Sequence, residues 1–400
     1  MNVGKAYFIG AGPGDPGLLP LKSAEALREA DVILYDRLVS VQLLKHARPG
    51  ARFIYVGKES GHHTVSQSEI NELIVTEAKR GQIVVRLKGG DPGIFGRVGE
   101  EAEACGKHLI PFEIIPGVTS GIGAACYAGI PLTHRELSSN VAFISGHRSA
   151  ENEADEMNWT AFAGLDTLVF YMGVSELPRI RSRLIAAGKP PETPAALIRW
   201  GTSADQMTCV GTLERIADLA QEKQIRPPAL LVVGEVVKLR ERMNWFEQKP
   251  LFGKRVLMFA DSLSAKPCAS FLSSNGAETA EVPWIRHASI PAISVSAQEG
   301  GWNWDVFAEY MKEWERGRGF NTLWVSGVRG LSGLLAACAM RKDWADRLRR
   351  IPETIVVGEQ AAEQAREHGW HVTATVREGE PAHRTLEAWL AVGRPVNSVS

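Results

Sequence analysis

The chain has 400 residues, a formal net charge of −1 and five cysteines. Its length predicts two or three domains, and its near-neutral charge gives no sign of the basic surface that nucleic acids or anionic membranes require. The cysteines are scattered without a CxxC pair, which argues against a zinc site or a disulfide framework and favours a reducing compartment, the cytoplasm. The N-terminus has no signal-peptide pattern, and no apolar stretch is long enough to span a bilayer.

The first part of the chain alternates strand-like and helix-like patterns. Short apolar runs predict strands at residues 6–10, 32–35, 53–56, 83–85 and 112–115, and helical periodicity predicts helices at 19–30 and 66–80. A helix of small residues is expected after residues 116–120. This alternation is typical of an α/β fold.

A new pattern starts near residue 140 and predicts a second α/β lobe. Its expected strands are residues 141–144, 167–171, 195–198, 207–210 and 229–234. The lobes join near residues 134–140, and residues 245–250 read as a linker. A fresh strand follows at 253–260, and eight of the eleven tryptophans lie past residue 250. We therefore expect domains at 1–246, with lobes of about 1–136 and 137–246, and at 251–400.

The segment RLKGGDPGIFGR at residues 86–97 is the most informative stretch of the chain. It follows a buried-strand pattern, and its two glycines would let a ligand approach the backbone closely. Asp91 then places a carboxylate at the strand's carboxyl end, where open α/β sheets bind ligands. Taken alone, the segment is equally compatible with an ordinary strand-to-helix turn.

The glycine loop GAGPGD at residues 10–15 does not predict a dinucleotide site. A Rossmann loop needs glycine or alanine at its sixth position, where this chain has Asp15. Pro13 and Pro16 also lack the backbone amide donors that a pyrophosphate would use. No GKS or GKT follows, so a phosphate loop is also excluded. Arginine, lysine and histidine recur at other predicted strand ends. Singly each is typical of a solvated loop, but together they suit a substrate with several carboxylates.

Residues 3–246 resemble the uroporphyrinogen-III C-methyltransferases of the tetrapyrrole methylase superfamily. The related cobalt-precorrin methylases, diphthine synthases and rRNA 2′-O-methylases share the first glycine loop and the GGDP loop, but YDRLVS, VGK and AGIPLTHR favour the uroporphyrinogen branch. The matching motifs are GAGPGDP (10–16), ADVILYDRLVS (30–40), VGK (56–58), QSEIN (67–71), VRLKGGDP (85–92), FGR (95–97), PGVTS (116–120), YAGIPLTHR (127–135), YMG (171–173), GT (201–202), GTL (211–213), PAL (228–230) and GEVVKLR (234–240).

This resemblance implies a two-lobed fold of two α/β sheets with the methyl donor, S-adenosyl-methionine, in the cleft between the lobes. It implies two methyl transfers to uroporphyrinogen III, giving precorrin-2 for sirohaem or cobalamin synthesis, and a homodimer without a metal. The positions that match donor-contacting residues of the family are Pro13, Gly89, Gly90, Asp91, Ile94, Thr119, Ser120, Met172, Gly201 and Ala229.

The resemblance also assigns proton transfer and substrate binding. Asp36 matches the proposed proton acceptor and Lys58 the proposed donor, with a structural salt bridge as the alternative. Arg86, His134 and Arg135 would bind the carboxylates of the substrate.

Two residues depart from the family pattern. Gly93 stands where a bulky apolar residue is usual, and Val98 stands where glycine is usual. Both put the turnover rate and the donor affinity in question, but not the fold.

Residues 251–400 resemble the N-terminal part of a uroporphyrinogen-III synthase. The matches are GKRVL (253–257), VSGVRG (325–330) and VVGEQAA (356–362). The family's Thr-Arg pair is replaced at residues 259–260 and its threonine at Ala361, and the sequence covers about half of the usual synthase length. We therefore expect a degenerate, inactive domain. The alternatives are a bifunctional methyltransferase and synthase, and a non-catalytic tetrapyrrole-binding protein.

Overall fold

The structure, a computed structural model, describes residues 3–57, 65–146, 157–260, 265–286, 300–377 and 389. The chain forms two compact units. One comprises Met1–Ser40 and His46–Gln248, and the other comprises Val41–Lys45 and Lys249–Ser400. Within the described ranges, none of the helices is long and apolar enough to cross a membrane.

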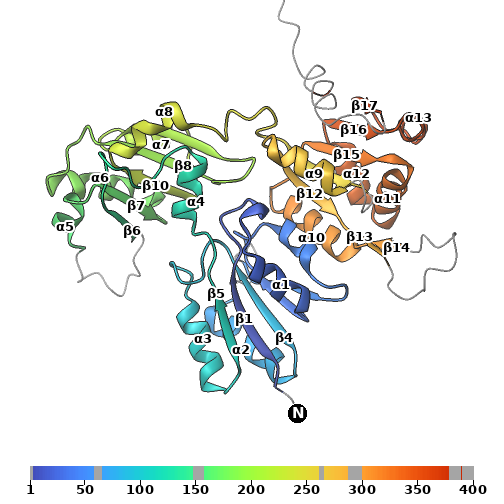
Figure 1. Cartoon of the computed structure of the whole chain (residues 1–400), viewed down its shortest axis with the longest axis horizontal. Helices are drawn as coiled ribbons and strands as arrows, with labels where there is room; N and C mark the ends of the chain where they lie inside the picture. Colours follow the sequence, from blue (N-terminus) through green and yellow to red (C-terminus); the bar gives the residue numbers. More distant parts are fainter. Residues whose placement is uncertain are drawn as a thin grey trace, which may run out of the picture. The chain divides into compact units, whose positions relative to one another are not determined.

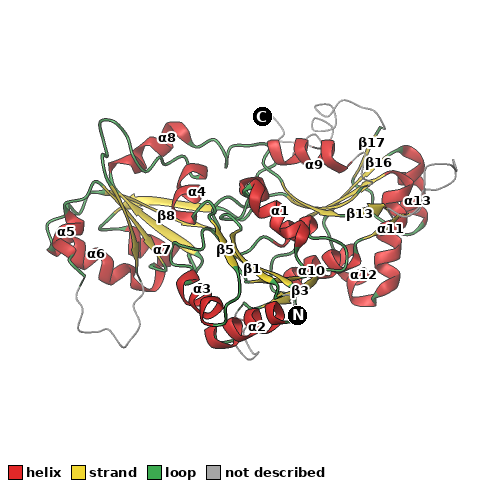
Figure 2. Cartoon of the chain, turned by 60° about the horizontal axis from the view of Figure 1, so that its bottom comes forward, coloured by secondary structure: helices red, strands yellow, loops and turns green. Residues whose placement is uncertain are grey.

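The first lobe of the first unit is a five-stranded parallel sheet in the order β3-β2-β4-β1-β5. All five strands lie where the apolar runs predict them. Helix α1 covers one face, and α2 and α3 cover the other (Figure 2). The elements are β1 (Lys5–Gly10), η1 (Pro16–Leu18), α1 (Leu21–Glu29), β2 (Val32–Tyr35), η2 (Val41–His46), β3 (Arg52–Tyr55), α2 (Gln67–Lys79), β4 (Ile83–Lys88), α3 (Val98–Lys107), β5 (Phe112–Ile115) and α4 (Ser120–Tyr127).

Local sequence explains where α2 begins. The Ser66 hydroxyl accepts a hydrogen bond from the Glu69 amide at 3.2 Å, and the Glu69 carboxylate accepts one from the Ser66 amide at 2.6 Å. This capping box satisfies amides that the helix itself cannot. Apolar α2 side chains, among them Ile70 and Ile74, then pack on the strand residues that face them, such as Phe8 and Leu34.

The second lobe is a mixed sheet in the order β6-β7-β10-β8-β9, in which β6 and β7 are parallel and the other pairs antiparallel. Alternate residues of β7 enter different cores, Leu168 and Phe170 on one face and Val169 and Tyr171 on the other. The elements are β6 (Val141–Ser145), α5 (Trp159–Ala163), β7 (Thr167–Tyr171), η4 (Val174–Glu176), α6 (Leu177–Ala186), β8 (Pro194–Arg199), β9 (Met207–Thr212), α7 (Ile216–Glu222), β10 (Ala229–Val233), η5 (Glu235–Leu239) and α8 (Arg240–Met243).

The second unit contains a third sheet, parallel throughout, in the order β12-β11-β15-β16-β17, and a two-stranded sheet of β13 and β14. The elements, labelled in Figure 1, are β11 (Arg255–Phe259), α9 (Ala265–Ser274), β12 (Glu278–Val282), β13 (Trp284–Arg286), β14 (Gly300–Trp302), α10 (Trp304–Glu315), β15 (Thr322–Ser326), α11 (Gly327–Met340), α12 (Lys342–Arg349), β16 (Glu353–Val357), α13 (Glu359–Glu367) and β17 (Ala374–Val376).

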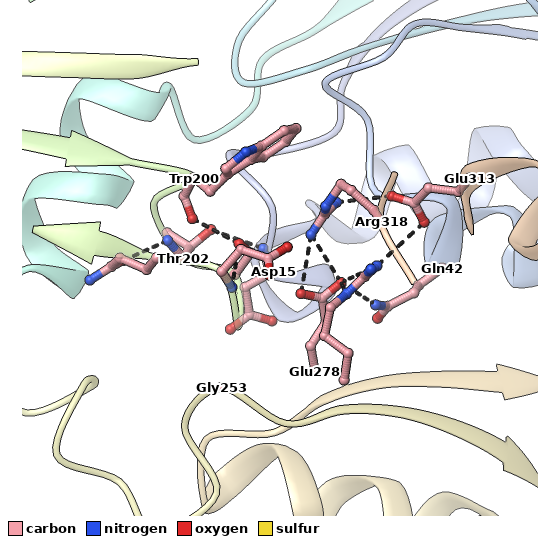
Figure 3. Close-up of polar contacts among 12 residues, drawn as sticks. Asp15, Gln42, Trp200, Thr202, Gly253, Glu278, Glu313 and Arg318 are labelled. Atoms are coloured by element: carbon pink, nitrogen blue, oxygen red, sulfur yellow. Dashed lines mark hydrogen bonds and ion pairs between the residues drawn. The ribbon is translucent and has the colours of Figure 1, made fainter. Parts of the chain in front are cut away.

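A cluster of ion pairs lies at the start of this third sheet (Figure 3). Arg255 is almost fully buried and donates to Glu278 at 3.1 Å, and it lies 3.5 Å from a Glu313 oxygen. Arg318 bonds both glutamates, at 3.3 and 2.9 Å. Because each buried carboxylate has two cationic partners, the charges are matched where β11 and β12 begin.

Candidate active site

Three glycine-containing loops meet backbone to backbone at the carboxyl ends of β1, β4 and β5. The Gly90 amide donates to the Gly12 carbonyl at 2.7 Å, and the Gly12 amide donates to the Gly90 carbonyl at 3.2 Å. A Cβ atom at Gly10 would lie 2.4 Å from the Gly117 Cα and 2.8 Å from the Gly90 oxygen. Real Cβ atoms do not approach so closely, so the first loop requires glycine for contact with the other two loops.

The Asp91 carboxylate ties two of these loops together. One oxygen accepts from the Gly93 amide at 2.7 Å, and the other accepts from the Gly117 amide at 2.8 Å. The carboxylate therefore holds the GGDP loop against the PGVTS loop. Gly93, one of the two departures from the family pattern, contributes its backbone amide to this arrangement. The other departure, Val98, begins α3 and packs on the first-lobe core.

A cavity of about 440 Å³ opens beside these loops and is lined from both lobes of the first unit. Seven of the ten predicted donor-contacting positions line it: Pro13, Gly89, Gly90, Ser120, Met172, Gly201 and Ala229. The sequence did not assign donor contacts to the other lining residues, which are Arg37, Leu38, Ala124, Tyr171, Val174, Ser175, Ile198, Trp200, Pro227, Pro228 and Leu230. Five of these belong to the matched motifs and three directly adjoin one, which was the available signal: Arg37, Leu38, Tyr171, Pro228 and Leu230 in the first group, and Val174, Trp200 and Pro227 in the second.

Strained backbone gathers on the second-lobe side of this cavity. Met172, Trp200 and Thr202 have positive φ angles of 53°, 47° and 70°, which non-glycine residues adopt at a cost. Met172 is half exposed although it lies in the cavity wall. Such conformations persist only where surrounding structure enforces them, and they concentrate at functional sites.

Asp15 links the first glycine loop to the second lobe. Its amide donates to the Thr202 hydroxyl at 3.0 Å, in the region drawn in Figure 3. Its carboxylate accepts from the Tyr127 hydroxyl at 2.6 Å and from the Gly17 amide at 2.7 Å. Burial, reinforced by the bond to Asp15, raises the pKa of Tyr127, so this phenol stays protonated and keeps donating. Asp15, the residue that excludes a dinucleotide loop, thus connects the two lobes by hydrogen bonds.

Tyr171 fixes the start of α4. Its hydroxyl lies 2.8 Å from the Thr119 hydroxyl and accepts from the Gly121 amide at 2.8 Å. Its ring contacts Phe95 at a centroid distance of 4.9 Å. Burial raises the pKa of Tyr171. The side chain of Thr119, predicted to contact the donor, is therefore bonded to Tyr171, and Ile94 lies on the exposed turn that precedes Phe95.

Asp36 takes part in a buried group of charges. Its carboxylate accepts from the Arg86 guanidinium at 3.3 Å and from the Leu38 amide at 3.0 Å. Arg86 also donates to Glu101 at 3.3 Å, and Lys88 bonds both Glu101 oxygens at 2.8 and 2.7 Å. Arg86 is only 5% exposed, so its guanidinium faces carboxylates of the chain itself.

The remaining predicted site residues lie elsewhere. His134 and Arg135 belong to the connection between α4 and β6, where the His134 amide donates to the Ser138 carbonyl at 2.9 Å. His134 is partly exposed and Arg135 exposed, and neither lines the cavity. Lys58 lies outside the residues that the structure describes.

Known proteins share this first unit. A uroporphyrinogen-III C-methyltransferase of Priestia megaterium is 55% identical over 236 residues, covering 59% of this chain and 99% of the relative. Another, of Bacillus subtilis (strain 168), is 46% identical over 308 residues, 77% of this chain and 64% of the relative. This chain thus spans less than two thirds of the Bacillus subtilis protein, and the match extends beyond the first unit.

A solved structure has the same fold. The crystal structure of uroporphyrin-III C-methyltransferase from Thermus thermophilus, complexed with S-adenosyl homocysteine, aligns with a TM-score of 0.51 and 40% identity. The alignment covers 59% of this chain and 100% of that one. Residues 5–217, more than half of the chain, match the tetrapyrrole (corrin/porphyrin) methylases as a family. The two-lobed α/β unit with its glycine-lined cavity therefore belongs to the tetrapyrrole (corrin/porphyrin) methylase family.

Proposed function

We propose that this chain is a uroporphyrinogen-III C-methyltransferase, which transfers two methyl groups from S-adenosyl-methionine to ring carbons of uroporphyrinogen III and releases precorrin-2. The observation that carries the proposal is the cavity between the two lobes. Its wall collects residues from motifs as far apart in the sequence as Pro13 and Ala229, and these are motifs on which the resemblance to the uroporphyrinogen-III C-methyltransferases rests.

The cavity fits a donor of this size and chemistry. Its volume of about 440 Å³ lies in the range of small-molecule sites. Apolar residues such as Ile198 and Leu230 supply surfaces for a flat base, and Gly89 and Gly90 expose backbone for polar groups. A Cβ atom at Gly201 would lie 2.2 Å from the Ala124 Cβ, so the wall between α4 and the β8–β9 turn depends on glycine there.

When bound, the donor supplies an electrophilic methyl group on a sulfonium. The chain's contribution is alignment, because an in-line displacement depends on how two bound molecules are held. The Asp91 and Tyr171 contacts immobilise the loops that form the cavity wall. Arg37, the charged residue among the lining residues, offers a cation to carboxylates at the cavity.

Proton transfer requires a base close to the substrate carbon. We assign this role to Asp36, which is partly exposed and follows β2 at the same sheet edge as the glycine loops. Arg86 orients the Asp36 carboxylate through its hydrogen bond. Lys58 is the proposed proton donor, and His134 and Arg135 are candidates for binding the substrate's carboxylates.

The second unit is proposed to be an inactive relative of uroporphyrinogen-III synthase. One of its three synthase-like segments enters β11, and the other two fall where β15 passes into α11 and where β16 passes into α13. These are carboxyl ends of neighbouring parallel strands, the edge at which such sheets bind ligands. A homodimer and a cytoplasmic location follow from the resemblance and the cysteine pattern, and sedimentation and cell fractionation test them.

The test is a turnover assay on the full chain. Incubation with uroporphyrinogen III and S-adenosyl-methionine should give a product whose mass has increased by two CH2 units, because each transferred methyl group replaces a proton. A parallel incubation with hydroxymethylbilane should give no enzymatic type III isomer. Donor binding without turnover would favour the binding-protein alternative, and formation of the type III isomer would favour the bifunctional one.

A further inference from the structure

Four charged side chains contact one another in series, from buried residues of the first lobe to Asp36, which precedes the cavity-lining Arg37; we call them the charge chain: Lys88, Glu101, Arg86 and Asp36. Lys88, Glu101 and Arg86 are 4%, 1% and 5% exposed, whereas the Asp36 side chain is 26% exposed. Each contacts the next at 2.7, 3.3 and 3.3 Å. The proposed base is thus the exposed end of an otherwise buried series.

The charge chain consists of two cationic and two carboxylate side chains. Arg86 stays charged in proteins and cannot adjust by losing a proton. Burial lowers the pKa of Lys88, and the charge of Arg86 lowers it further, whereas the ion pair with Glu101 raises it. The four formal charges therefore balance, and removing any single member leaves buried charge that is not balanced, which is costly.

Among the described residues, which do not include residues 58–64, few other charges face this series. From α2, the Gln67 amide donates to Glu101 at 3.2 Å and is neutral. On α3, burial raises the pKa of the Cys105 thiol to about 11, so it is uncharged at neutral pH. Arg97 and Glu100 near the start of α3 pair with each other at 2.7 Å and are exposed. Beside Asp36 in the sequence, Arg37 is also exposed.

We propose that Glu101 and Lys88 are positioning residues for methyl transfer, which fix Arg86 and through it set how readily the Asp36 carboxylate takes up a proton. The proposal rests on the function proposed above. Neither residue reaches the cavity. They act because Arg86 divides its guanidinium between two carboxylates, donating through Nε to Glu101 and through Nη2 to Asp36.

The sign of each perturbation follows from the charges. Glu101→Gln removes a negative charge and leaves Asp36 as the carboxylate partner of Arg86, so Asp36 should titrate at lower pH. Lys88→Met removes a positive charge and leaves an excess carboxylate beside Arg86, so Asp36 should titrate at higher pH. The double variant removes one charge of each sign and should restore the original midpoint.

The direct measurement is a carbon-13 NMR titration of the aspartate carboxyl carbons in the full chain, with Asp36→Asn identifying the signal. We expect the midpoints of the two single variants to shift in opposite directions from that of the unmodified chain. The acid limb of the single-turnover methylation rate should move in the same directions. Thermal unfolding of each variant monitors folding. If one single variant does not fold, the titration midpoints of the other single variant and of the double variant test the proposal.

Opposite shifts that cancel in the double variant would support the proposal. Shifts of the same sign, or an unmoved midpoint in a folded single variant, would overturn it, because a merely structural role predicts lower stability without opposite shifts. The NMR readout does not depend on turnover. An inactive unmodified chain with the expected shifts would therefore refute the proposed function but leave the electrostatic coupling intact.

Discussion

Asp91→Ala should weaken binding of the methyl donor by releasing the loops that form the cavity wall. The Asp91 carboxylate accepts two backbone amides, from Gly93 at 2.7 Å and from Gly117 at 2.8 Å. Hydrogen bonds to charged groups each contribute about 1.5–3 kcal/mol. Because Asp91 is partly exposed, the lower end applies, and removing both bonds should cost about 3 kcal/mol of unfolding free energy.

The same two bonds hold the loops that carry Gly90 and Ser120 in the cavity wall. Releasing those loops should weaken binding of S-adenosyl-homocysteine at least about tenfold, a change of about 1.4 kcal/mol. Isothermal calorimetry measures the affinity, and urea unfolding measures the stability. Asp91→Asn keeps one acceptor oxygen and the shape of the side chain. Its donor affinity and stability should therefore lie between those of Asp91→Ala and the unmodified chain.

A matched control separates general destabilisation from loop positioning. Asp166 also accepts backbone and side-chain donors in a loop, from the Ser139 amide at 2.8 Å and the Asn140 side chain at 2.9 Å. It does not line the cavity. Asp166→Ala should therefore lower stability but leave the donor affinity unchanged. If Asp91→Ala lost stability while binding the donor as tightly as the unmodified chain, the reasoning would be refuted.

Four further outcomes are expected. Asp36→Asn should slow single-turnover methylation by about 10²-fold or more with donor affinity retained, and a near-normal rate would remove Asp36 from the chemistry. Tyr171→Phe leaves a buried amide and a hydroxyl without their partner, so chemical unfolding should show a loss of about 1–3 kcal/mol. Gly10→Ala forces its loop away from Gly117, and calorimetry should find donor binding abolished; wild-type affinity would contradict the packing argument. A chain ended at Gln248 should still fold and methylate, since the first unit has its own cores, and a folded but inactive product would assign the second unit a role in catalysis.

Local patterns predicted the strands well, because buried parallel strands are continuous apolar runs and the second-lobe strands alternate between two cores. The predicted donor positions mostly line one cavity because they are motif glycines and their neighbours. The sequence did not reveal the hydrogen bonds between residues that are distant in the sequence. Asp91 bonds a residue 26 positions away, and Tyr171 bonds one 52 positions away. Such pairs depend on tertiary structure and leave no local pattern.

Arg86 shows why a cation at a strand end is ambiguous. It lies within β4, which has strand neighbours on both sides, and its buried side chain is paired with Glu101 of α3. Glu101 carried a signal of its own. It stands four residues before Cys105 and three after Val98, on the apolar face of α3, and a carboxylate on a buried face needs a cationic partner.

The most direct test of the account is a crystal structure of this chain with S-adenosyl-homocysteine. The account predicts density in the cavity between the two lobes of the first unit, in contact with Gly90, Met172 and Ala229. Well-defined ligand density at another site, with this cavity filled by solvent, would contradict it.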